Sequence, residues 1–209
     1  MSRCRRNAFL CFTLAVSVVA AAGCTQSTPG KEFFMIEASR PSGAVQTPGD
    51  ATLEVHLLNV DTAYASKNLV YRLGEFRYET DYYRQFLVTP GQMITEKTRR
   101  WLADSGLFKQ VLPPSSQSTP TYALQGIVTS LYGDFTNASA PVAVMRIRFF
   151  LAGRGGEEGP IVFSQAYRVT QPLSDKTADA LMDAFSKDLA EILTHFEEDL
   201  RKYLAKPAS

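Results

Sequence analysis

The most strongly patterned stretch of the chain is residues 174–207, which read SDKTADALMDAFSKDLAEILTHFEEDLRKYLAKP. Ser174 is a residue type that caps helices, and Pro172 and Pro207 bound the segment. The apolar residues between them keep helical spacing: Ala178, Leu181, Met182, Phe185, Leu189, Ile192, Leu193, Phe196, Leu200, Tyr203 and Leu204. At 1.5 Å per residue, a helix of about thirty residues is on the order of 45 Å long, enough to cover a small sheet. The pattern predicts a helix packed along a sheet; the alternative is that part of the stripe faces a partner subunit in a homo-oligomer.

A second helix is predicted for residues 89–106. Thr89 can cap it, Pro90 suits the first helical position, and Gln92 stands where a capping box needs it. Gly106 can end the helix in a left-handed conformation. One face carries Ile94, Thr98, Trp101 and Leu102, and Trp101 is interpreted as a core residue.

Seven stretches have the pattern of β-strands: residues 33–36, 53–57, 69–73, 76–79, 122–132, 144–151 and 161–169. Gly74-Glu75 predicts a hairpin with a two-residue type II′ turn, and Gly126 predicts a bulge. In residues 144–151 the apolar side chains share one face, while Arg146 and Arg148 share the other. The last two strands are expected to be antiparallel neighbours.

These elements predict an α/β (α+β) fold: a mostly antiparallel β-sheet packed by one mid-chain helix and one long C-terminal helix. The length suits one domain with a substantial core. We assign residues 1–23 to a signal peptide, residues 24–31 to a lipidated N-terminus and spacer, and residues 32–209 to a single domain.

The N-terminus has the order of a bacterial lipoprotein signal. Residues 1–6 carry three arginines, residues 8–22 are almost entirely apolar, and Ala21-Ala22-Gly23-Cys24 closes the run. The apolar part is shorter than the roughly 20 residues that a permanent membrane helix needs. Cys24 is therefore the predicted lipidation site, where acyl chains would hold the protein at a membrane. The alternatives are an ordinary secretory signal that ends at a cysteine and an uncleaved membrane anchor.

The remaining composition argues against several classes of protein. Cys4 and Cys11 lie inside the signal, so the processed chain keeps no free thiol for a disulfide, a thiolate metal site or a nucleophile. Removal of residues 1–23 takes away three arginines and no acid, which lowers the formal net charge from +1 to −2. That balance argues against nucleic acid as the partner.

No set of residues has the pattern of a catalytic or metal site. His56 and His195 have no partner at metal-ligand spacing, and no Gly-x-Ser-x-Gly motif occurs. The following acids are expected to be exposed: Asp81, Glu157, Glu158, Glu197, Glu198 and Asp199. We predict no catalytic residue, no cofactor and no metal; a periplasmic hydrolase is the disfavoured alternative.

An aromatic cluster interleaved with basic residues comprises Tyr78, Tyr82, Tyr83 and Phe86, with Arg77 and Arg84. Amphipathic aromatics beside arginine are typical of protein interfaces. Tyr82, Tyr83 and Phe86 are therefore candidate partner-binding residues. The competing interpretation is that they are core residues where the hairpin meets the helix.

With its elements in this order, the chain resembles the ABC-type transport auxiliary lipoprotein family. The resemblance lies in Cys24, in the run Phe33-Phe34-Met35-Ile36-Glu37, and in residues 69–111, LVYRLGEFRYETDYYRQFLVTPGQMITEKTRRWLADSGLFKQV. This last segment has the family's order of strand, Tyr-rich turn, amphipathic helix and Ser-Gly-Leu-Phe turn into a strand. Phe86 stands where the family commonly has Trp.

The resemblance implies a non-catalytic docking component of an intermembrane lipid transport system. Its partners would be a mammalian-cell-entry-type periplasmic protein and an ABC permease complex. Thr25 follows Cys24 where an Asp would often signal inner-membrane retention, so the resemblance implies an outer-membrane lipoprotein that faces the periplasm. The second hypothesis is an envelope-assembly or structural lipoprotein that binds outer-membrane protein or lipopolysaccharide.

Overall fold

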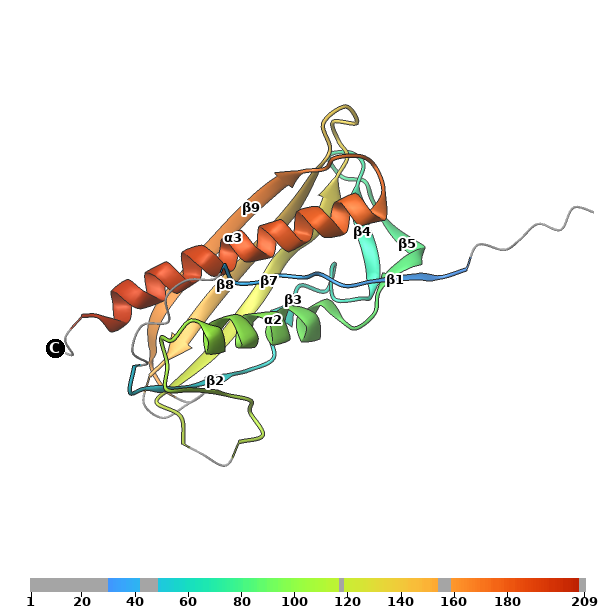
Figure 1. The fold of residues 1–209 in the computed structure, drawn as a ribbon. Helices are drawn as coiled ribbons and strands as arrows, with labels where there is room; N and C mark the ends of the chain where they lie inside the picture. The colour runs from blue at the N-terminus through green and yellow to red at the C-terminus, as the bar shows by residue number, and fades with distance from the viewer. Residues whose placement is uncertain (1–29, 42–48, 117–118, 154–158, 207–209) are drawn as a thin grey trace, which may run out of the picture. The chain divides into compact units, whose positions relative to one another are not determined.

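The three longest strands of the described sheet are consecutive and antiparallel, and the last of them forms an edge: β7 (Tyr122–Asp134), β8 (Val142–Ala152) and β9 (Ile161–Pro172). The computed structural model describes residues 30–41, 49–116, 119–153 and 159–206 (Figure 1). The sequence predicted all three strands and the antiparallel pairing of β8 with β9. As predicted, alternate side chains of β8 are buried, while Arg146 and Arg148 are exposed on the other face.

Three short strands share the other edge of β7, each parallel to it: β2 (Thr52–Val55), β3 (Asn59–Val60) and β4 (Asn68–Arg72). Outside them, β6 (Gln110–Leu112) pairs with β2 in parallel, and β5 (Tyr78–Phe86) pairs with β4 in an antiparallel hairpin. Finally, β1 (Glu32–Phe34) pairs in parallel with β5. The described sheet is therefore mixed: its two longest pairings are antiparallel, but its parallel pairings are two or three residues each.

Two local predictions about glycines were wrong. The hairpin exists, but Arg72 pairs with Tyr78 and the Leu73 N–H donates to the Arg77 carbonyl oxygen (2.9 Å), so the connection is longer than two residues. Gly74 does not have the positive φ of a type II′ turn. The bulge in β7 lies between Val128 and Ser130 rather than at Gly126, whose missing side chain instead leaves room for Leu58.

The two helices, α2 (Pro90–Asp104) and α3 (Ala178–Leu204), pack on one face of the sheet (Figure 1). The start of α2 is as predicted: the Thr89 N–H and hydroxyl both donate to Gln92 Oε1, at 3.4 and 2.8 Å. Gly106, which follows the helix, has φ 68°. Neither α2 nor α3 is long and apolar enough to cross a membrane.

The start of α3 differs from the prediction, because Thr177 rather than Ser174 is the capping residue. Thr177 Oγ1 accepts the Ala180 N–H at 3.2 Å, and the Asp175 carboxylate in turn accepts the Thr177 N–H at 2.7 Å. The carboxylate thus orients the threonine that caps the helix, and residues 174–177 precede the first turn.

The apolar stripe of α3 lies against the sheet, as the helical spacing predicted. Phe149 of β8 and Phe196 of α3 are fully buried and stack with ring centroids 4.0 Å apart. Beside them, the Tyr167 hydroxyl donates to the Asp199 carboxylate at 2.9 Å. Since the stripe is covered within the chain, it does not need a partner subunit to bury it.

Candidate functional site

An extended segment, residues 35–41, follows β1 and runs between α2 and α3 (Figure 1). We call it the strap. The Ile36 N–H points to Met93 Sδ of α2 at 3.1 Å, and the Glu37 N–H donates to Ser186 Oγ of α3 at 3.0 Å. Ile36 is fully buried, and Glu37 also pairs with Lys97. The strap therefore ties the start of the domain to both helices.

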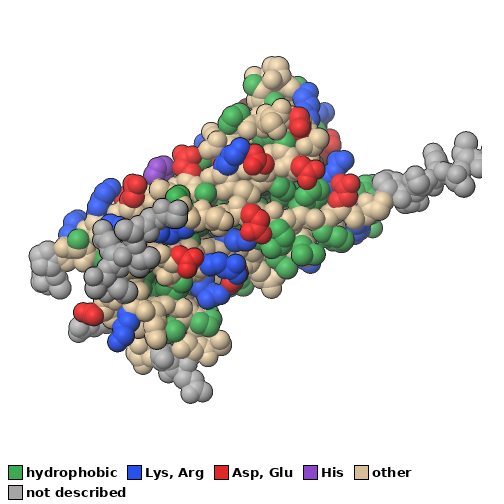
Figure 2. Space-filling model, viewed as in Figure 1, with side chains coloured by type: hydrophobic (Ala, Val, Ile, Leu, Met, Phe, Trp, Pro, Cys, Tyr) green, Lys and Arg blue, Asp and Glu red, His purple; other side chains and the backbone are tan. Residues whose placement is uncertain are grey.

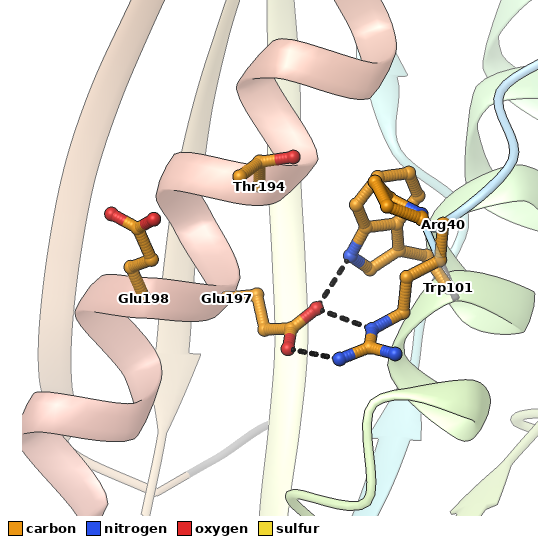
Figure 3. Close-up of a pocket in the computed structure, with 6 residues that line it drawn as sticks. Arg40, Trp101, Thr194, Glu197 and Glu198 are labelled. Atoms are coloured by element: carbon orange, nitrogen blue, oxygen red, sulfur yellow. Dashed lines mark hydrogen bonds and ion pairs between the residues drawn. The ribbon is translucent and has the colours of Figure 1, made fainter. Parts of the chain in front are cut away.

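At the end of the strap, Arg40 is held by Glu197 of α3, which also accepts a hydrogen bond from Trp101 of α2 (Figure 3). We call these three residues the latch. Arg40 Nε and Nη2 donate to the two Glu197 oxygens at 2.8 and 2.9 Å, and Trp101 Nε1 donates to Glu197 Oε2 at 2.9 Å. Arg201 adds a further donor at 2.9 Å. One carboxylate thus joins the strap, α2 and α3.

The latch residues have the shifted pKa values expected of a paired ion in a partly buried site. Burial acts to raise the pKa of Glu197, but hydrogen bonds from Arg40, Arg201 and Trp101 outweigh it and hold that pKa below its usual range. The bond to Glu197 likewise raises the pKa of Arg40. Both groups therefore stay charged at neutral pH.

Two small cavities flank Arg40. One, of about 160 Å³, is lined by Trp101, Thr194, Glu197 and Glu198 together with the strap (Figure 3). The other, of about 180 Å³, is lined largely by charged residues of the strap and α2. Both are below the roughly 300–1,000 Å³ of typical ligand pockets, and charged walls do not suit an acyl chain. The latch is better suited to hold the strap than to bind a lipid.

Apolar side chains gather on the outer edge of the sheet at β1 and β5. We call this surface the edge patch; its residues are Lys31, Phe33, Met35, Tyr82, Tyr83 and Leu87. The Leu87 N–H donates to the Phe34 carbonyl oxygen at 2.9 Å, and the Lys31 ammonium lies 4.4 Å from the centre of the Tyr82 ring. Figure 2 shows hydrophobic side chains gathered at this end of the domain.

The three predicted partner-binding residues differ in exposure. Tyr82 is 63% exposed and Tyr83 is 42% exposed, with their rings in edge contact at 5.3 Å. Phe86, by contrast, is 2% exposed and packs in the core. The interface interpretation thus stays open for the two tyrosines, whereas Phe86 is the core residue of the competing interpretation. Cys24, the predicted lipidation site, lies outside the described residues.

Three acids that were expected to be exposed are buried or partly buried: Glu197, Asp81 and Asp199; Glu157 and Glu158 lie outside the described residues. Glu197 is 8% exposed, because the latch encloses it. The Asp81 carboxylate is largely covered and accepts the N–H groups of Tyr83 and Arg84 at 2.9 and 3.0 Å, so it shapes the backbone that presents the tyrosines. A signal for Glu197 was present in the sequence, since it follows Leu193 by four residues on the inward side of the helix.

The fold and the site define a small domain whose first strand and strap are fastened to its core, with an exposed aromatic edge beside them. The family model for the ABC-type transport auxiliary lipoprotein component matches residues 34–195. The chain belongs to that family, as its resemblance implied.

Two solved structures share the fold at low sequence identity, and a third is similar only with a TM-score below 0.5. A Xanthomonas campestris protein of family DUF330 has a TM-score of 0.68 at 18% identity and covers 79% of this chain and 92% of its own. An uncharacterised protein has a TM-score of 0.60 at 12% identity, covering 80% and 99%. The PelC protein of Paraburkholderia phytofirmans, a dodecamer, has a TM-score of 0.43 at 15% identity, covering 77% and 92%. Comparison with curated protein sequences gives no match.

Proposed function

We propose that this protein is an outer-membrane-anchored auxiliary lipoprotein of an ABC-type, mammalian-cell-entry-type intermembrane lipid transport system. It acts as a non-catalytic docking component that faces the periplasm. Membership of the auxiliary lipoprotein family supports the transport role. The observation that carries the docking role is the fastening of the strap by the latch, because it makes the N-terminal end of the domain a firm point of attachment.

The edge patch is the proposed docking surface for the mammalian-cell-entry-type protein of the ABC permease complex. Exposed aromatic rings give large contact areas at a low cost in side-chain entropy, which is why Tyr is enriched at interfaces. The outer side of α3 is less suitable, since Asp183, Lys187 and Glu191 make it charged. Tyr82 and Tyr83 are thus retained as partner-binding residues, joined by Phe33.

Co-purification tests this proposal directly. In solubilised membranes, the double variant Tyr82→Ala/Tyr83→Ala is expected to recover at least tenfold less mammalian-cell-entry-type protein than the unaltered chain, since loss of one interface aromatic typically costs about 1–2 kcal/mol. Ile161→Ala is the matched control, because Ile161 is apolar and 51% exposed but lies on β9, away from the edge patch. Equal recovery with the double variant and the control would refute the assignment of the docking surface.

The lipid anchor has a separate test. Cys24→Ser is expected to release the protein from membranes or to stall its precursor, because the thiol is the acceptor of the predicted acyl chains. Normal processing and membrane attachment of that variant would refute the anchor without bearing on the edge patch.

A further inference from the structure

The face of the sheet that points away from α2 and α3 carries three arginines, Arg146, Arg148 and Arg168, which we call the basic face. Arg146 of β8 is the register partner of Arg168 of β9, and Arg148 lies two residues further along β8 on the same side. All three are exposed. None of them has a hydrogen bond or ion pair within the described part of the chain.

This arrangement has a cost that folding alone does not explain. Like charges directly opposite on neighbouring strands destabilise a sheet, and side chains two residues apart on a strand are only about 7 Å apart. Acidic side chains could have neutralised the array, but none of the register neighbours is acidic: Ser130 of β7 faces Arg146, and Ala166 of β9 faces Arg148. The basic face is therefore available to an anionic surface outside the chain.

The residues around the basic face indicate which kind of anionic surface it binds. Protein interfaces depend on exposed aromatic or long aliphatic anchors. The large apolar side chains that are exposed on the described domain are not register neighbours of these arginines. A phospholipid headgroup needs no such anchor, because a guanidinium can bind its phosphate through paired hydrogen bonds.

We propose that the basic face rests on an anionic phospholipid bilayer, with the three guanidinium groups paired with headgroup phosphates. Each basic residue near an anionic membrane is worth about a fivefold gain in binding, so three are worth about a hundredfold. Contacts of this strength suffice for a protein that an acyl anchor already holds at the surface. The inference therefore rests on the anchor of the proposed function. It places α2 and α3 away from the bilayer.

Thiol accessibility on the full lipidated chain tests this orientation. The chain is reconstituted into vesicles of phosphatidylcholine alone or with phosphatidylglycerol, and a water-soluble maleimide modifies Ser164→Cys on the sheet or Lys187→Cys on the outer side of α3. With phosphatidylglycerol at low salt, modification of Ser164→Cys should slow by up to about a hundredfold, and Lys187→Cys should react equally in both vesicles. High salt should abolish the protection, because screening weakens exposed charge contacts.

Added substitutions identify the arginines as the cause. Arg146→Gln, Arg148→Gln and Arg168→Gln should each reduce the protection of Ser164→Cys about fivefold. Equal modification rates in the two vesicles, or protection that survives all three substitutions, would overturn the proposal. So would protection that requires added membrane proteins, since an acidic protein would then be the partner.

Vesicle flotation separates this failure from a failure of the anchor. If the chain floats with phosphatidylcholine vesicles but Ser164→Cys shows no protection with phosphatidylglycerol, the membrane contact of the basic face is refuted and the anchor is not. A chain that does not float with phosphatidylcholine refutes the anchor; flotation with phosphatidylglycerol that is lost in the triple Gln variant would then still support the basic face.

Discussion

Glu197→Gln is expected to lower the free energy of unfolding by about 2–3 kcal/mol, because removing one partner of a buried ion pair typically costs about 3–5 kcal/mol. Glu197 accepts bonds from Arg40, Trp101 and Arg201. The amide retains one acceptor oxygen but turns its own NH₂ toward these donors. The estimate lies below the typical range because the Arg40 and Arg201 side chains are 16% and 36% exposed.

Urea denaturation followed by tryptophan fluorescence measures this loss at the latch itself, since Trp101 is the only tryptophan in the chain. Circular dichroism provides a second probe of the whole fold. Glu198→Gln is the matched control: it makes the same chemical change one residue further on, at an exposed position. The control should stay within about 0.5 kcal/mol of the unaltered chain. A Glu197→Gln variant that is equally stable would refute the structural role of the latch.

The loss of stability in Glu197→Gln should depend on pH. Burial acts to raise the pKa of Glu197, but the hydrogen bonds from Arg40, Arg201 and Trp101 together outweigh burial and hold the pKa in the folded chain below its ordinary value of 4.5. Its stabilising contribution is therefore fully present above that ordinary value and is lost as the pH falls through the folded-state pKa. The stability difference between the unaltered chain and Glu197→Gln should shrink between about pH 5 and pH 3. A difference that stays constant over this range would contradict the ionised latch.

Three further substitutions test the core, the backbone and a buried acid, each by urea denaturation. Phe149→Ala should lower the free energy of unfolding by about 3–5 kcal/mol because Phe149 is fully buried. Phe150→Ala, on the other side of the strand, should lower it by less than half of that; equal losses would contradict the assigned faces. Gly91→Ala should cost at least about 1 kcal/mol, since a Cβ there would lie 2.8 Å from a backbone oxygen. Gly74→Ala should be tolerated; if it is destabilised instead, Gly74 needs the positive φ of a type II′ turn after all. Burial, with a smaller effect from a nearby acid, raises the pKa of Asp188 to about 8, so the free energy of unfolding should fall as the pH rises from about 4 to 8. Asp188→Asn should remove that fall; if the pH profile of the variant is unchanged, the raised pKa of Asp188 is contradicted.

The long elements could be predicted from the sequence because their side-chain periods are long enough to be unambiguous. Residues 178–204 and β7, β8 and β9 each present a regular apolar face, and burial of that face determines the packing. The short strands β1, β2 and β4 overlap predicted stretches, but their parallel pairing could not be predicted, and β3 and β6 gave no strand pattern. β3 and β6 contain two and three residues, too few to show a period, and their pairing depends on β7 and β2, which are distant in sequence or joined by loops.

The candidate site was predictable only in part. The sequence marks Tyr82 and Tyr83 as candidates, because aromatics interleaved with arginine are chemically distinctive; both side chains are exposed, and their role in partner binding stays a prediction. The latch was missed because Arg40 and Glu197 are 157 residues apart, and no local pattern links a residue in an apparent loop to one helical acid. Glu197 and Asp188 both occupy positions where the helical period calls for an apolar residue, which is the signal that could have marked them as special.

The latch has a mechanical consequence if acyl chains at the N-terminus hold the chain, as proposed above. β1 pairs with β5 over only three residues, a contact too short to resist a sustained pull, so the strap and latch must hold the first strand in place. A weakened latch should therefore release residues 31–41 by local opening before β7, β8 and β9 unfold. Limited proteolysis of Glu197→Gln with a glutamate-specific protease should cut after Glu32 or Glu37 faster than in the Glu198→Gln control, with the remainder of the domain intact. Cleavage that begins elsewhere, or only with global unfolding, would show that the strap is held by the sheet and not by the latch.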